Sequence, residues 1–380
     1  MIPPRRTLVK IRVERDALAD AVAWSARTLP TRPSLPVLAG VVLSAAGDSI
    51  TLSSFDYEVS TRVEIDADVE SAGSALVSGR LLADIARSLP AQPVVIAAEG
   101  SRVMITCGRA SFTLPTLPLD DYPAMPEMPQ SSGTLDGDTF ASAVAQVAIA
   151  AGRDDTLPTL TGIRMEIDGD SVVLAATDRY RLAVRELSWT PSSPSTQAEL
   201  LIPAKTLADA AKSFGSAETV TLALAPDGER LIGFEGDRRR TTSRLLDGEF
   251  PKYRSLLPNE SSTHAVVDTA ALVEAVKRVA LVAERNTPVR LTFTQGEVGL
   301  RAGTGDDAQA EEALEATVTG DDIEIAFNPG YLLDGLTAID AGQAQFAFTQ
   351  STRPAVLSGI VEDQVRSEYR YLLMPVRLTG

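Results

Sequence analysis

The stretch GRLLADIARSLP, at residues 79–90, has two further copies in the chain, PAKTLADAAKSFG at 203–215 and NPGYLLDGLTAID at 328–340. In each copy the apolar residues recur at the spacing of one face of a helix. Leu82, Leu207 and Leu332 hold the same position in the three copies, at steps of 125 residues. A step this regular predicts one structural unit that is repeated three times along the chain.

A second predicted helix opens each unit. Its three copies are Asp16–Leu29, Asp138–Ala151 and Thr269–Glu284, with Asp16, Asp138 and Thr269 as candidate N-caps. A related segment follows each of these helices: LPVLAGV at 35–41, LPTLTGI at 157–163 and TPVRLTF at 287–293. The stretches in between alternate apolar and polar residues and end in turn residues, which is typical of antiparallel strands.

We therefore expect an α+β fold of three repeated domains, each made of two helices packed on antiparallel sheets. The predicted domains are residues 1–130 with a short N-terminal extension, 131–258 and 259–380. Segments rich in Pro and small polar residues, at 122–133 and 256–263, mark the two boundaries. The chain of 380 residues is also too long for one ordinary hydrophobic core.

Composition indicates a globular protein, with 44% hydrophobic and 23% charged residues. No apolar run approaches the length of a membrane span, and no apolar segment follows Arg5 and Arg6 as it would in a signal peptide. Cys107 is the only cysteine and cannot form an internal disulfide. We expect a cytoplasmic protein with no membrane partner.

Catalytic and cofactor motifs are missing from the sequence. It contains no Walker A pattern and no G-x-G-x-x-G after a predicted strand. One histidine, His264, expected in an exposed loop, and one cysteine argue against a His-based triad or a Cys/His metal site. We expect no catalytic residue, no metal and no cofactor. A hydrolase that uses only carboxylates stays open, because two acids brought together by folding leave no local pattern.

Six motifs in order resemble the bacterial DNA polymerase III β subunit family, the sliding clamps, in its actinobacterial type. They are RPSLPVLAGV (32–41), SFTLPTLPLDDYP (111–123), ATDRYRLAV (176–184), LLDGEFPKYRSLLP (245–258), FNPGYLLDGL (327–336) and YLLMPVRL (371–378). The resemblance implies a processivity factor of DNA replication that is not an enzyme. Its implied partners are double-stranded DNA, the replicative polymerase, the clamp loader and other client proteins that carry a short linear motif.

The resemblance also implies a homodimer. Two chains of this family join head to tail, so that six domains form a ring with helices lining the hole. By motif position the contact would join Arg109, Phe112 and Leu114 of one chain to Leu281 and Val282 of the other. For Phe112 a place in the core of its own domain is the alternative. A head-to-tail contact stays soluble only if the rotation closes, and three similar units per chain satisfy that condition.

A pocket for client peptides, between the second and third domains, is the third implication. Carried over by motif, it contains Leu160, Thr177, Arg179, Tyr180, Arg181, Leu182, Pro251, Leu256, Pro354, Met374, Pro375, Val376, Arg377 and Leu378. An extended peptide with Leu and Phe anchors needs an apolar concavity of this kind. Met374 is unbranched and suits a site with several clients, and Arg181 or Arg377 would orient polar groups of the peptide.

The net charge of −16 argues against a nucleic-acid binder, since phosphate contacts need Lys and Arg. The six predicted helical windows nevertheless carry a combined charge of +2, so the acidity lies outside the helices. Helices of this kind suit a ring that slides on DNA without gripping it. The candidate DNA-facing residues are Arg27, Arg32, Arg80, Arg87, Arg153, Lys205, Lys212, Lys277 and Arg278. Ordinary solvated helix charge is an equally good explanation for any one of them.

A resistance paralogue or decoy is the alternative function. Such a protein would share the ring and the pocket but bind an inhibitor or different clients, and the sequence does not separate the two roles.

Overall fold

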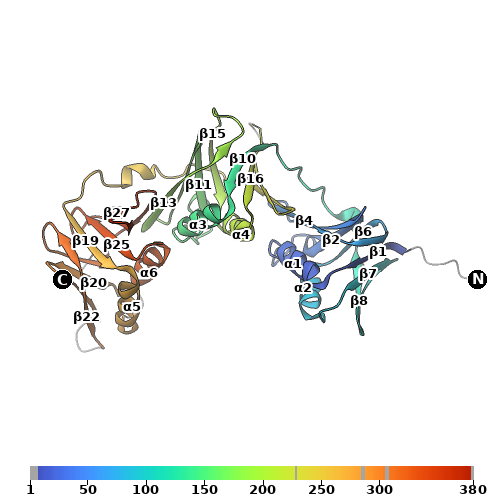
Figure 1. Ribbon diagram of the computed structural model, residues 1–380, viewed down its shortest axis with the longest axis horizontal. Coiled ribbons are helices and arrows are strands. Elements are labelled where there is room, and N and C mark those ends of the chain that lie inside the picture. The colour runs from blue at the N-terminus through green and yellow to red at the C-terminus, as the bar shows by residue number, and fades with distance from the viewer. Residues whose placement is uncertain (1–6, 227–228, 284–286, 304–307, 378–380) are drawn as a thin grey trace, which may run out of the picture. The chain divides into compact units, whose positions relative to one another are not determined.

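The computed structural model describes residues 7–226, 229–283, 287–303 and 308–377, with side chains from Val9 onward. It divides into two compact units, each with its own packing (Figure 1). The N-terminal unit comprises Met1–Asp138, Thr190–Ser193 and Asp209–Leu245, and the C-terminal unit comprises Thr139–Trp189, Pro194–Ala208 and Leu246–Gly380. The middle third of the chain contributes to both units, so the boundaries expected at 130/131 and 258/259 stay a prediction.

The order of secondary-structure elements repeats three times. Repeat 1 is β1(Thr7–Val13), α1(Arg15–Ala26), η1(Pro36–Ala39), β2(Gly40–Ala46), β3(Ser49–Phe55), β4(Val59–Asp66), β5(Asp68–Ser71), β6(Gly73–Ser78), α2(Gly79–Ser88), β7(Val94–Glu99), β8(Arg102–Cys107), β9(Ala110–Leu117) and η2(Leu119–Asp121). Repeat 2 is β10(Ser131–Asp136), α3(Gly137–Ala148), η3(Pro158–Thr161), β11(Gly162–Asp168), β12(Ser171–Thr177), β13(Arg181–Ser188), β14(Thr190–Pro191), β15(Gln197–Pro203), α4(Ala204–Phe214), β16(Thr219–Leu224), β17(Leu231–Gly236), β18(Arg239–Arg244) and η4(Tyr253–Leu256). Repeat 3 is β19(Thr263–Asp268), α5(Thr269–Val279), η5(Ala280–Val282), β20(Val289–Thr294), β21(Glu297–Ala302), β22(Ala310–Glu315), β23(Thr317–Thr319), β24(Ile323–Phe327), α6(Pro329–Ala338), β25(Gln343–Phe348), β26(Ala355–Val361), β27(Gln364–Val365) and β28(Tyr369–Leu373). The predicted fold of two helices and antiparallel strands in each of three units is confirmed.

One sheet runs through the N-terminal unit, in the strand order β14-β10-β16-β17-β18-β4-β3-β2-β6-β9-β8-β7-β1-β5. Repeats 1 and 2 share it because β4 pairs with β18, where Val63 lies opposite Arg239. The pairing is antiparallel, as it is between the neighbouring strands β3 and β4. Backbone hydrogen bonds therefore continue from one repeat into the next.

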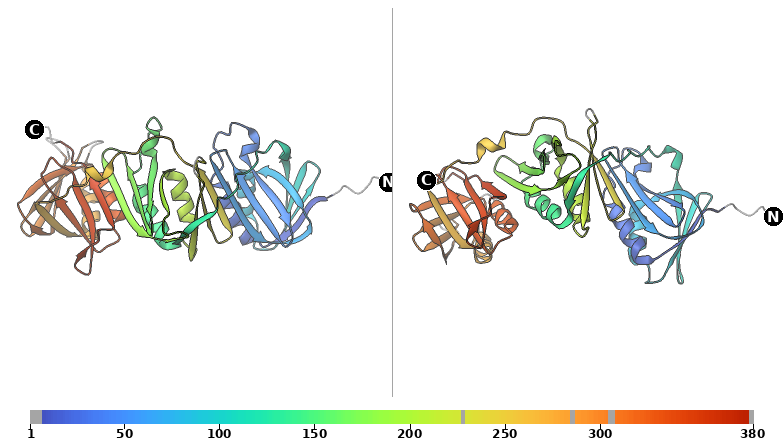
Figure 2. Two further views of the ribbon diagram at one scale, coloured as in Figure 1. Left: turned by 90° about the horizontal axis from the view of Figure 1, so that it is seen from above. Right: turned by 45° about the horizontal axis from the view of Figure 1, so that its top comes forward.

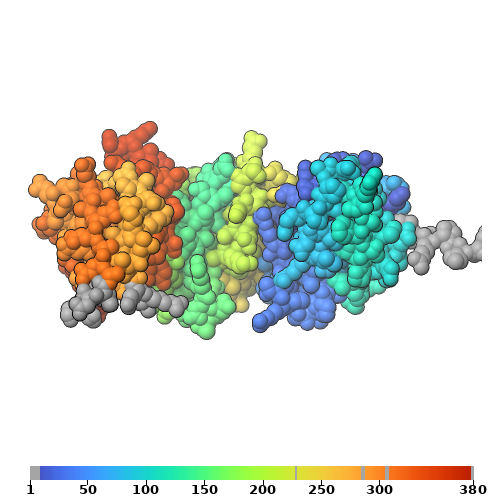
Figure 3. All heavy atoms as spheres, turned by 90° about the horizontal axis from the view of Figure 1, so that it is seen from below, coloured from blue at the N-terminus to red at the C-terminus, as the bar shows by residue number. Residues whose placement is uncertain are grey.

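Two sheets form the C-terminal unit. The larger has the order β15-β11-β12-β13-β28-β26-β25-β19-β23, with β27 paired to β26, and the smaller has the order β22-β21-β20-β24. Repeats 2 and 3 share the larger sheet because β13 pairs with β28, where Arg181 lies opposite Leu373. Both views of Figure 2 show helices of each unit lying against its sheets, and Figure 3 shows one outer face of the units with all heavy atoms drawn.

Apolar helix faces build the cores, as the sequence predicts. Leu82, Leu207 and Leu332 are each 0% exposed, so the leucine that marks the repeat is a core residue in all three copies. In the N-terminal unit, Leu18 of α1 joins Leu82 of α2 in one cluster of buried side chains that extends over strands of the sheet. None of the helices that the structure describes has the length and apolar character needed to cross a bilayer.

The helix ends differ from the predicted ones. The N-cap of α5 is Asp268, whose carboxylate accepts from the backbone N–H of Ala271 at 2.8 Å, and Thr269 is already helical. Asp16 and Asp138 likewise lie inside the first turns of α1 and α3. The strand before each helix runs directly into it, so the capping position falls one or two residues earlier than a propensity pattern places it.

His264 also differs from expectation. It lies in β19 and is half-buried, with its Nε2 atom 3.1 Å from the Ser261 hydroxyl, whereas the sequence suggested an exposed loop. The strand extends to this residue because β19 pairs with both β23 and β25.

Gly335 of α6 provides a test of the packing between α6 and β28. A Cβ atom there would lie 2.4 Å from the Cδ1 and Cε1 atoms of Tyr371, a buried ring with little room to move. We expect Gly335→Ala to lower the free energy of unfolding by about 1–3 kcal/mol, measured by urea denaturation. Gly342→Ala is the matched control, since no atom lies within 4 Å of its Cβ position, and it should leave stability unchanged or slightly higher. Equal stability of the two variants would contradict close packing at Gly335.

Candidate functional site

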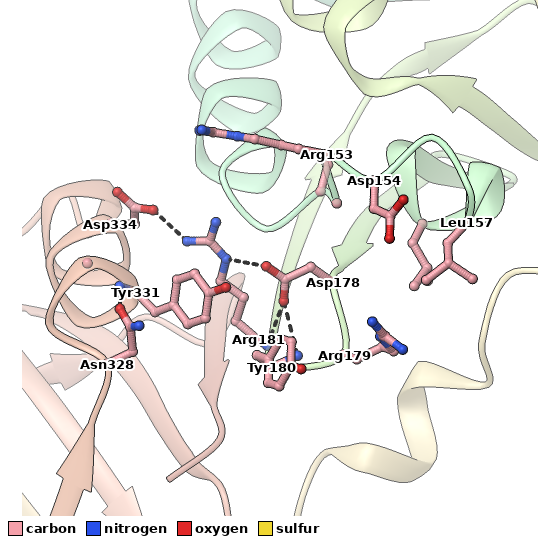
Figure 4. A pocket seen from close by; sticks show the side chains of 14 residues that line it. Arg153, Asp154, Leu157, Asp178, Arg179, Tyr180, Arg181, Asn328, Tyr331 and Asp334 are labelled. Carbon is pink, nitrogen blue, oxygen red and sulfur yellow. Dashed lines mark hydrogen bonds and ion pairs between the residues drawn. The ribbon is translucent and has the colours of Figure 1, made fainter. Parts of the chain in front are cut away.

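The C-terminal unit contains a pocket of about 700 Å³. It is lined by Ala151, Gly152, Arg153, Asp154, Leu157, Leu160, Asp178, Arg179, Tyr180, Arg181, Asn328, Gly330, Tyr331 and Asp334. These residues come from three segments: the stretch from the end of α3 into η3, the turn between β12 and β13 with the first residue of β13, and α6 with its N-cap (Figure 4). Segments that are distant in sequence therefore meet at one concave surface.

The side chain of Asp178 stabilises the turn between β12 and β13. One carboxylate oxygen of Asp178 accepts from the backbone N–H groups of Tyr180 at 3.0 Å and Arg181 at 3.1 Å. Arg179, between them, has a φ of 80°, in the left-handed region that residues other than glycine rarely adopt. This tight turn exposes the side chains of Arg179 and Tyr180 at the pocket, and Tyr180 is 55% exposed.

Arg181 joins the turn to α6. Its side chain is only 5% exposed and donates to Asp178 at 3.0 Å and to Asp334 at 2.5 Å. Its guanidinium also lies 4.3 Å from the centre of the Tyr331 ring. Burial alone would lower the pKa of Arg181, but the hydrogen bonds and charges of Asp334, Tyr371 and Asp178 together outweigh it and hold that pKa above its ordinary value. Arg181 is thus a fixed brace that lines the pocket with both acids bound to it, and the expectation that Arg181 or Arg377 orients a bound peptide stays a prediction.

Aromatic and aliphatic groups form the apolar part of the pocket. The rings of Tyr180 and Tyr331 stack with centroids 6.2 Å apart, and Leu157 and Leu160 supply aliphatic surface. The Asn328 side chain caps α6 by accepting from the Tyr331 backbone N–H at 3.1 Å, so the cap holds the helical turn that carries Tyr331. A concavity of this size with apolar walls and a few polar groups suits the side chains of an extended peptide.

The structure brings together only part of the predicted pocket. Leu160, Arg179, Tyr180 and Arg181 line it. The C-terminal segment runs beside it, since the Met374 N–H donates to the Tyr180 carbonyl at 2.9 Å and the Val376 N–H to the Ala326 carbonyl at 2.8 Å. Along this segment Met374 and Arg377 are exposed and Pro375 and Val376 are half-buried, as is Pro354, while Leu378 lies outside the described residues.

Two predicted pocket residues are buried instead. Thr177 is buried and its hydroxyl donates to the Arg181 carbonyl at 2.7 Å, inside the turn. Leu182 is buried with Phe250 and Leu372 in an apolar cluster. The motif match identifies a segment, but alternate residues of a strand point to opposite faces, and the match does not say which face borders the cavity.

Sequence reasoning missed the α6 wall of the pocket. Asn328, Tyr331 and Asp334 lie within the motif FNPGYLLDGL that was used only to recognise the family. Their spacing of three residues places them along one side of a helix, which was the available indication. Arg153, expected to face DNA, lines the pocket with Asp154.

Pro251 and Leu256, also predicted for the pocket, are exposed on a segment that is anchored by Glu166 of β11. Glu166 accepts from Arg254 and from the Tyr253 hydroxyl, the latter at 3.1 Å, and pairs with Arg164 at 2.5 Å. Burial would raise the pKa of Glu166, but the hydrogen bonds from Arg254 and Arg164 outweigh it and hold the pKa below its ordinary value. The ionised carboxylate therefore ties η4 to the sheet.

The nine candidate DNA-facing residues are all exposed, and all lie in helices, at helix ends or in the loops after them. Several have protein partners. Arg278 makes a two-pronged pair with Glu312, Lys277 pairs with Glu274 at 2.8 Å, and Arg27 donates to the Ser213 hydroxyl at 3.1 Å. Their exposure agrees with either expectation for them, a DNA-facing role or ordinary solvated charge.

The predicted dimer residues separate into surface and core. Leu281 is 84% exposed, Arg109 is exposed in the turn between β8 and β9, and Val282 is half-buried in η5. Phe112 is half-buried against the core of the N-terminal unit. Leu114 is 1% exposed, so its expected place in an interface is corrected to the core, because its side chain belongs to the buried cluster that includes Leu18 of α1 and Leu82 of α2.

No cluster of three or more His, Cys, Asp or Glu side chains in the described part of the chain has the arrangement to hold a metal ion. Cys107 is buried, with its Sγ atom within 3.3 Å of the carbonyls of Pro90 and Gln92.

Comparisons with known proteins agree over nearly the whole chain. Three family models of the DNA polymerase III β subunit match: the N-terminal domain at 9–126, the central domain at 134–252 and the C-terminal domain at 254–377. The chain is 61% identical over 376 residues to the beta sliding clamp of Streptomyces coelicolor, covering 98% of this chain and 100% of that protein. It is 48% identical to the beta sliding clamp homolog GriR of Streptomyces muensis, with 97% and 99% covered. A crystal structure of a Pseudomonas aeruginosa sliding clamp bound to griselimycin is similar with a TM-score of 0.89 at 28% identity, covering 97% of this chain and 100% of that one.

Glu166→Gln tests whether the ionised Glu166 stabilises the fold. A carboxyl whose pKa is lowered by folding contributes stability above its ordinary pKa of 4.5, and that contribution is lost as the pH falls below it. We expect the stability of the wild type to fall more steeply than that of Glu166→Gln between about pH 5 and pH 3, measured by urea denaturation. Glu362→Gln, in the exposed turn between β26 and β27, is the control and should follow the wild-type curve. Parallel curves for wild type and Glu166→Gln would refute the role of this carboxylate.

Proposed function

The chain belongs to the bacterial DNA polymerase III β subunit family, the sliding clamps, and on that premise we propose that two copies of it join head to tail into a ring that encircles duplex DNA. Its function is that of a sliding clamp, which confers processivity on the replicative DNA polymerase. The pocket of the C-terminal unit binds the linear motifs of the polymerase, the clamp loader and other clients. The protein acts without catalysis or cofactor, in the cytoplasm where the chromosome is replicated.

The proposed ring is supported by two strand edges whose backbone groups pair with no neighbouring strand among the described residues. β4 of repeat 1 pairs with β18 of repeat 2, and β13 of repeat 2 pairs with β28 of repeat 3 in the same antiparallel manner. By its place in the repeat, β22 corresponds to β4 and β13, and β9 corresponds to β18 and β28. Among the described residues β22 is the edge of its sheet, and Ala110–Pro115 of β9 pair only with β8.

The two edges complement one another in a second copy of the chain. The β22 edge of one protomer and the β9 edge of its partner would form the same kind of antiparallel strand pair, here called a join, that links successive repeats through β4–β18 and β13–β28. Unpaired edges otherwise favour uncontrolled association, and a closed ring removes them. Two copies with three repeats each give six such repeats and six joins.

The observed joins also predict the register of this contact. Val63 lies opposite Arg239 in the β4–β18 pair. Aligning the paired residues of the β3–β4 and β21–β22 hairpins places Glu312 of repeat 3 at the position of Val63. Aligning the β17–β18 and β8–β9 hairpins in the same way places Ala110 of repeat 1 at the position of Arg239. We therefore expect Glu312 opposite Ala110 of the partner, and by the same step Ala310 opposite Phe112.

Apolar burial supplies most of the expected dimer stability. Leu281 is the most exposed large apolar side chain among the described residues, and burying a side chain of this size contributes about 1.5–3 kcal/mol. Glu311 and Glu315 on β22 and Arg109 beside β9 have opposite charges. Exposed ion pairs of this kind add little affinity and rather favour one orientation of the partners.

A ring binds DNA by topology, so it does not need strong phosphate contacts. The exposed basic residues on the helices supply weak, salt-sensitive attraction that is compatible with sliding. The higher identity to the S. coelicolor clamp than to GriR supports a replicative role over that of a resistance paralogue.

Leu281→Asp tests the dimer contact. Wild-type protein should sediment at about twice the chain mass of 40.3 kDa at micromolar concentration, and Leu281→Asp should move it toward the monomer mass, because a buried carboxylate at the contact is strongly unfavourable. Val365→Asp changes another exposed apolar residue, on β27 outside the contact, and should leave the dimer intact. A monomeric wild type, or a Leu281→Asp dimer as stable as wild type, would disprove this interface.

Retention on circular DNA tests the ring itself. Protein loaded onto a nicked circular plasmid should remain bound during gel filtration, and linearising the plasmid should release it, because a ring slides off free ends. Residual binding should fall modestly as salt rises. Equal retention on circular and linear templates would show that the binding is not topological.

A further inference from the structure

We propose that Arg179 makes the pocket selective for client segments that carry a carboxylate beside their apolar anchors. This inference rests on the proposed client-binding function and deepens it, since it assigns a chemical class to the ligand. It is carried by the charge balance of the pocket, by the backbone of the Arg179 turn, and by the comparison of that turn with its counterpart in repeat 1.

Most charges that line the pocket are already satisfied. Arg181 pairs with Asp178 and Asp334, so these three groups form a closed cluster. Asp154 uses one carboxylate oxygen to accept from the Thr156 N–H at 3.0 Å and from the Thr156 hydroxyl at 2.7 Å. These acids therefore have partners within the protein.

Two of the lining arginines, Arg153 and Arg179, are exposed and make no side-chain hydrogen bond or ion pair within the described residues. Figure 4 shows the Arg153 guanidinium on the side of the pocket away from Leu157, so Arg179 is the unpaired cation beside the apolar wall. It lies 5.9 Å from the centre of the Tyr180 ring, and its charge acts on Asp154 without forming an ion pair with it. Figure 4 shows Arg179 on the side of the pocket where Asp154 and Leu157 lie. Its donor groups are thus available to a bound ligand.

The backbone does not explain why an arginine stands there. The corresponding turn of repeat 1 has the same design: Asp56 accepts from the N–H groups of Glu58 at 3.0 Å and Val59 at 2.7 Å, and Tyr57 has a φ of 77°. The turn itself therefore requires the left-handed conformation, which glycine adopts with the least strain. An arginine at this position adds strain, so any advantage must come from its side chain.

The chemistry of that side chain indicates the ligand. A guanidinium offers paired N–H donors that match a carboxylate, and it stays protonated at all physiological pH values. The chain as a whole has a net charge of −16, which disfavours acidic segments elsewhere on its surface. Arg179, an uncommitted cation that lines the pocket with Leu157, Leu160 and Tyr180, would admit an acidic residue while the anchors occupy the apolar surface.

Pairs of synthetic peptides provide the test. The probes are acetylated, amidated pentapeptides with Leu and Phe anchors that differ only in Asp or Asn at each of the other positions. Calorimetric titration of the full-length dimer at low salt should show at least one Asp peptide binding about two- to fivefold more tightly than its Asn twin. The difference should shrink at high salt, which an effect of shape alone would not do.

Three variants test whether Arg179 causes the preference for the Asp peptide over its Asn twin. Arg179→Gln should abolish the difference between the twins while retaining binding of the Asn peptide, and Arg179→Lys should restore part of it. Tyr57→Gln places the same residue in the equivalent turn of repeat 1, in the N-terminal unit, and should keep the full preference.

The outcomes separate this inference from the function on which it rests. Peptides that bind equally as Asp and Asn forms, or a preference that survives in Arg179→Gln, would overturn the role of Arg179 and leave client binding intact. A wild-type protein that binds none of the peptides would overturn client binding in this pocket, and the inference with it.

Discussion

Pairing of strand edges between repeats is the constraint on which the structure depends. A single repeat ends in strands whose backbone N–H and C=O groups need partners, and the next repeat supplies them, through β4 with β18 and through β13 with β28. The second of these pairings also places apolar residues of neighbouring repeats together, as in the cluster of Leu182 with Leu372. A chain of three such repeats necessarily leaves one edge unmatched at each end of the series, and this is why a second copy of the chain is the natural partner.

The pocket is a consequence of the second join. Because β13 and β28 are neighbours in one sheet, the turn before β13 comes to lie beside α6, which precedes the last strands of repeat 3. Arg181 stabilises this arrangement by pairing with an acid from its own turn and one from α6. The brace keeps Tyr180 and Tyr331 stacked, so the apolar wall of the pocket does not need a bound ligand to form. The same turn exposes Arg179, whose uncommitted charge gives the pocket its chemical character.

The differences between expectation and structure share one physical origin. Leu114 and Leu182 lie in motifs that were assigned to surfaces, yet both side chains point into a core. Asn328 and Asp334 lie in a motif that was assigned no site, yet both border the pocket. A motif identifies a segment, whereas a strand or helix presents its residues to different surroundings according to what packs on each face. The helix caps differ for a related reason, since the strand that precedes α5 decides where the first free N–H groups fall.

The sequence alone determined the threefold repetition, the six helices, the antiparallel character of the strands and the family. All of these follow from local periodicity and ordered motifs, such as the 125-residue step from Leu82 to Leu207 to Leu332. Only the tertiary structure decided which strand edges pair, which remain open, and which side chains meet at the pocket. Contacts such as that of Arg181 with Asp334 join residues that are far apart in the chain, and their formation depends on the register of β13 with β28. That register is set by the packing of whole sheets, which no local pattern of residues records.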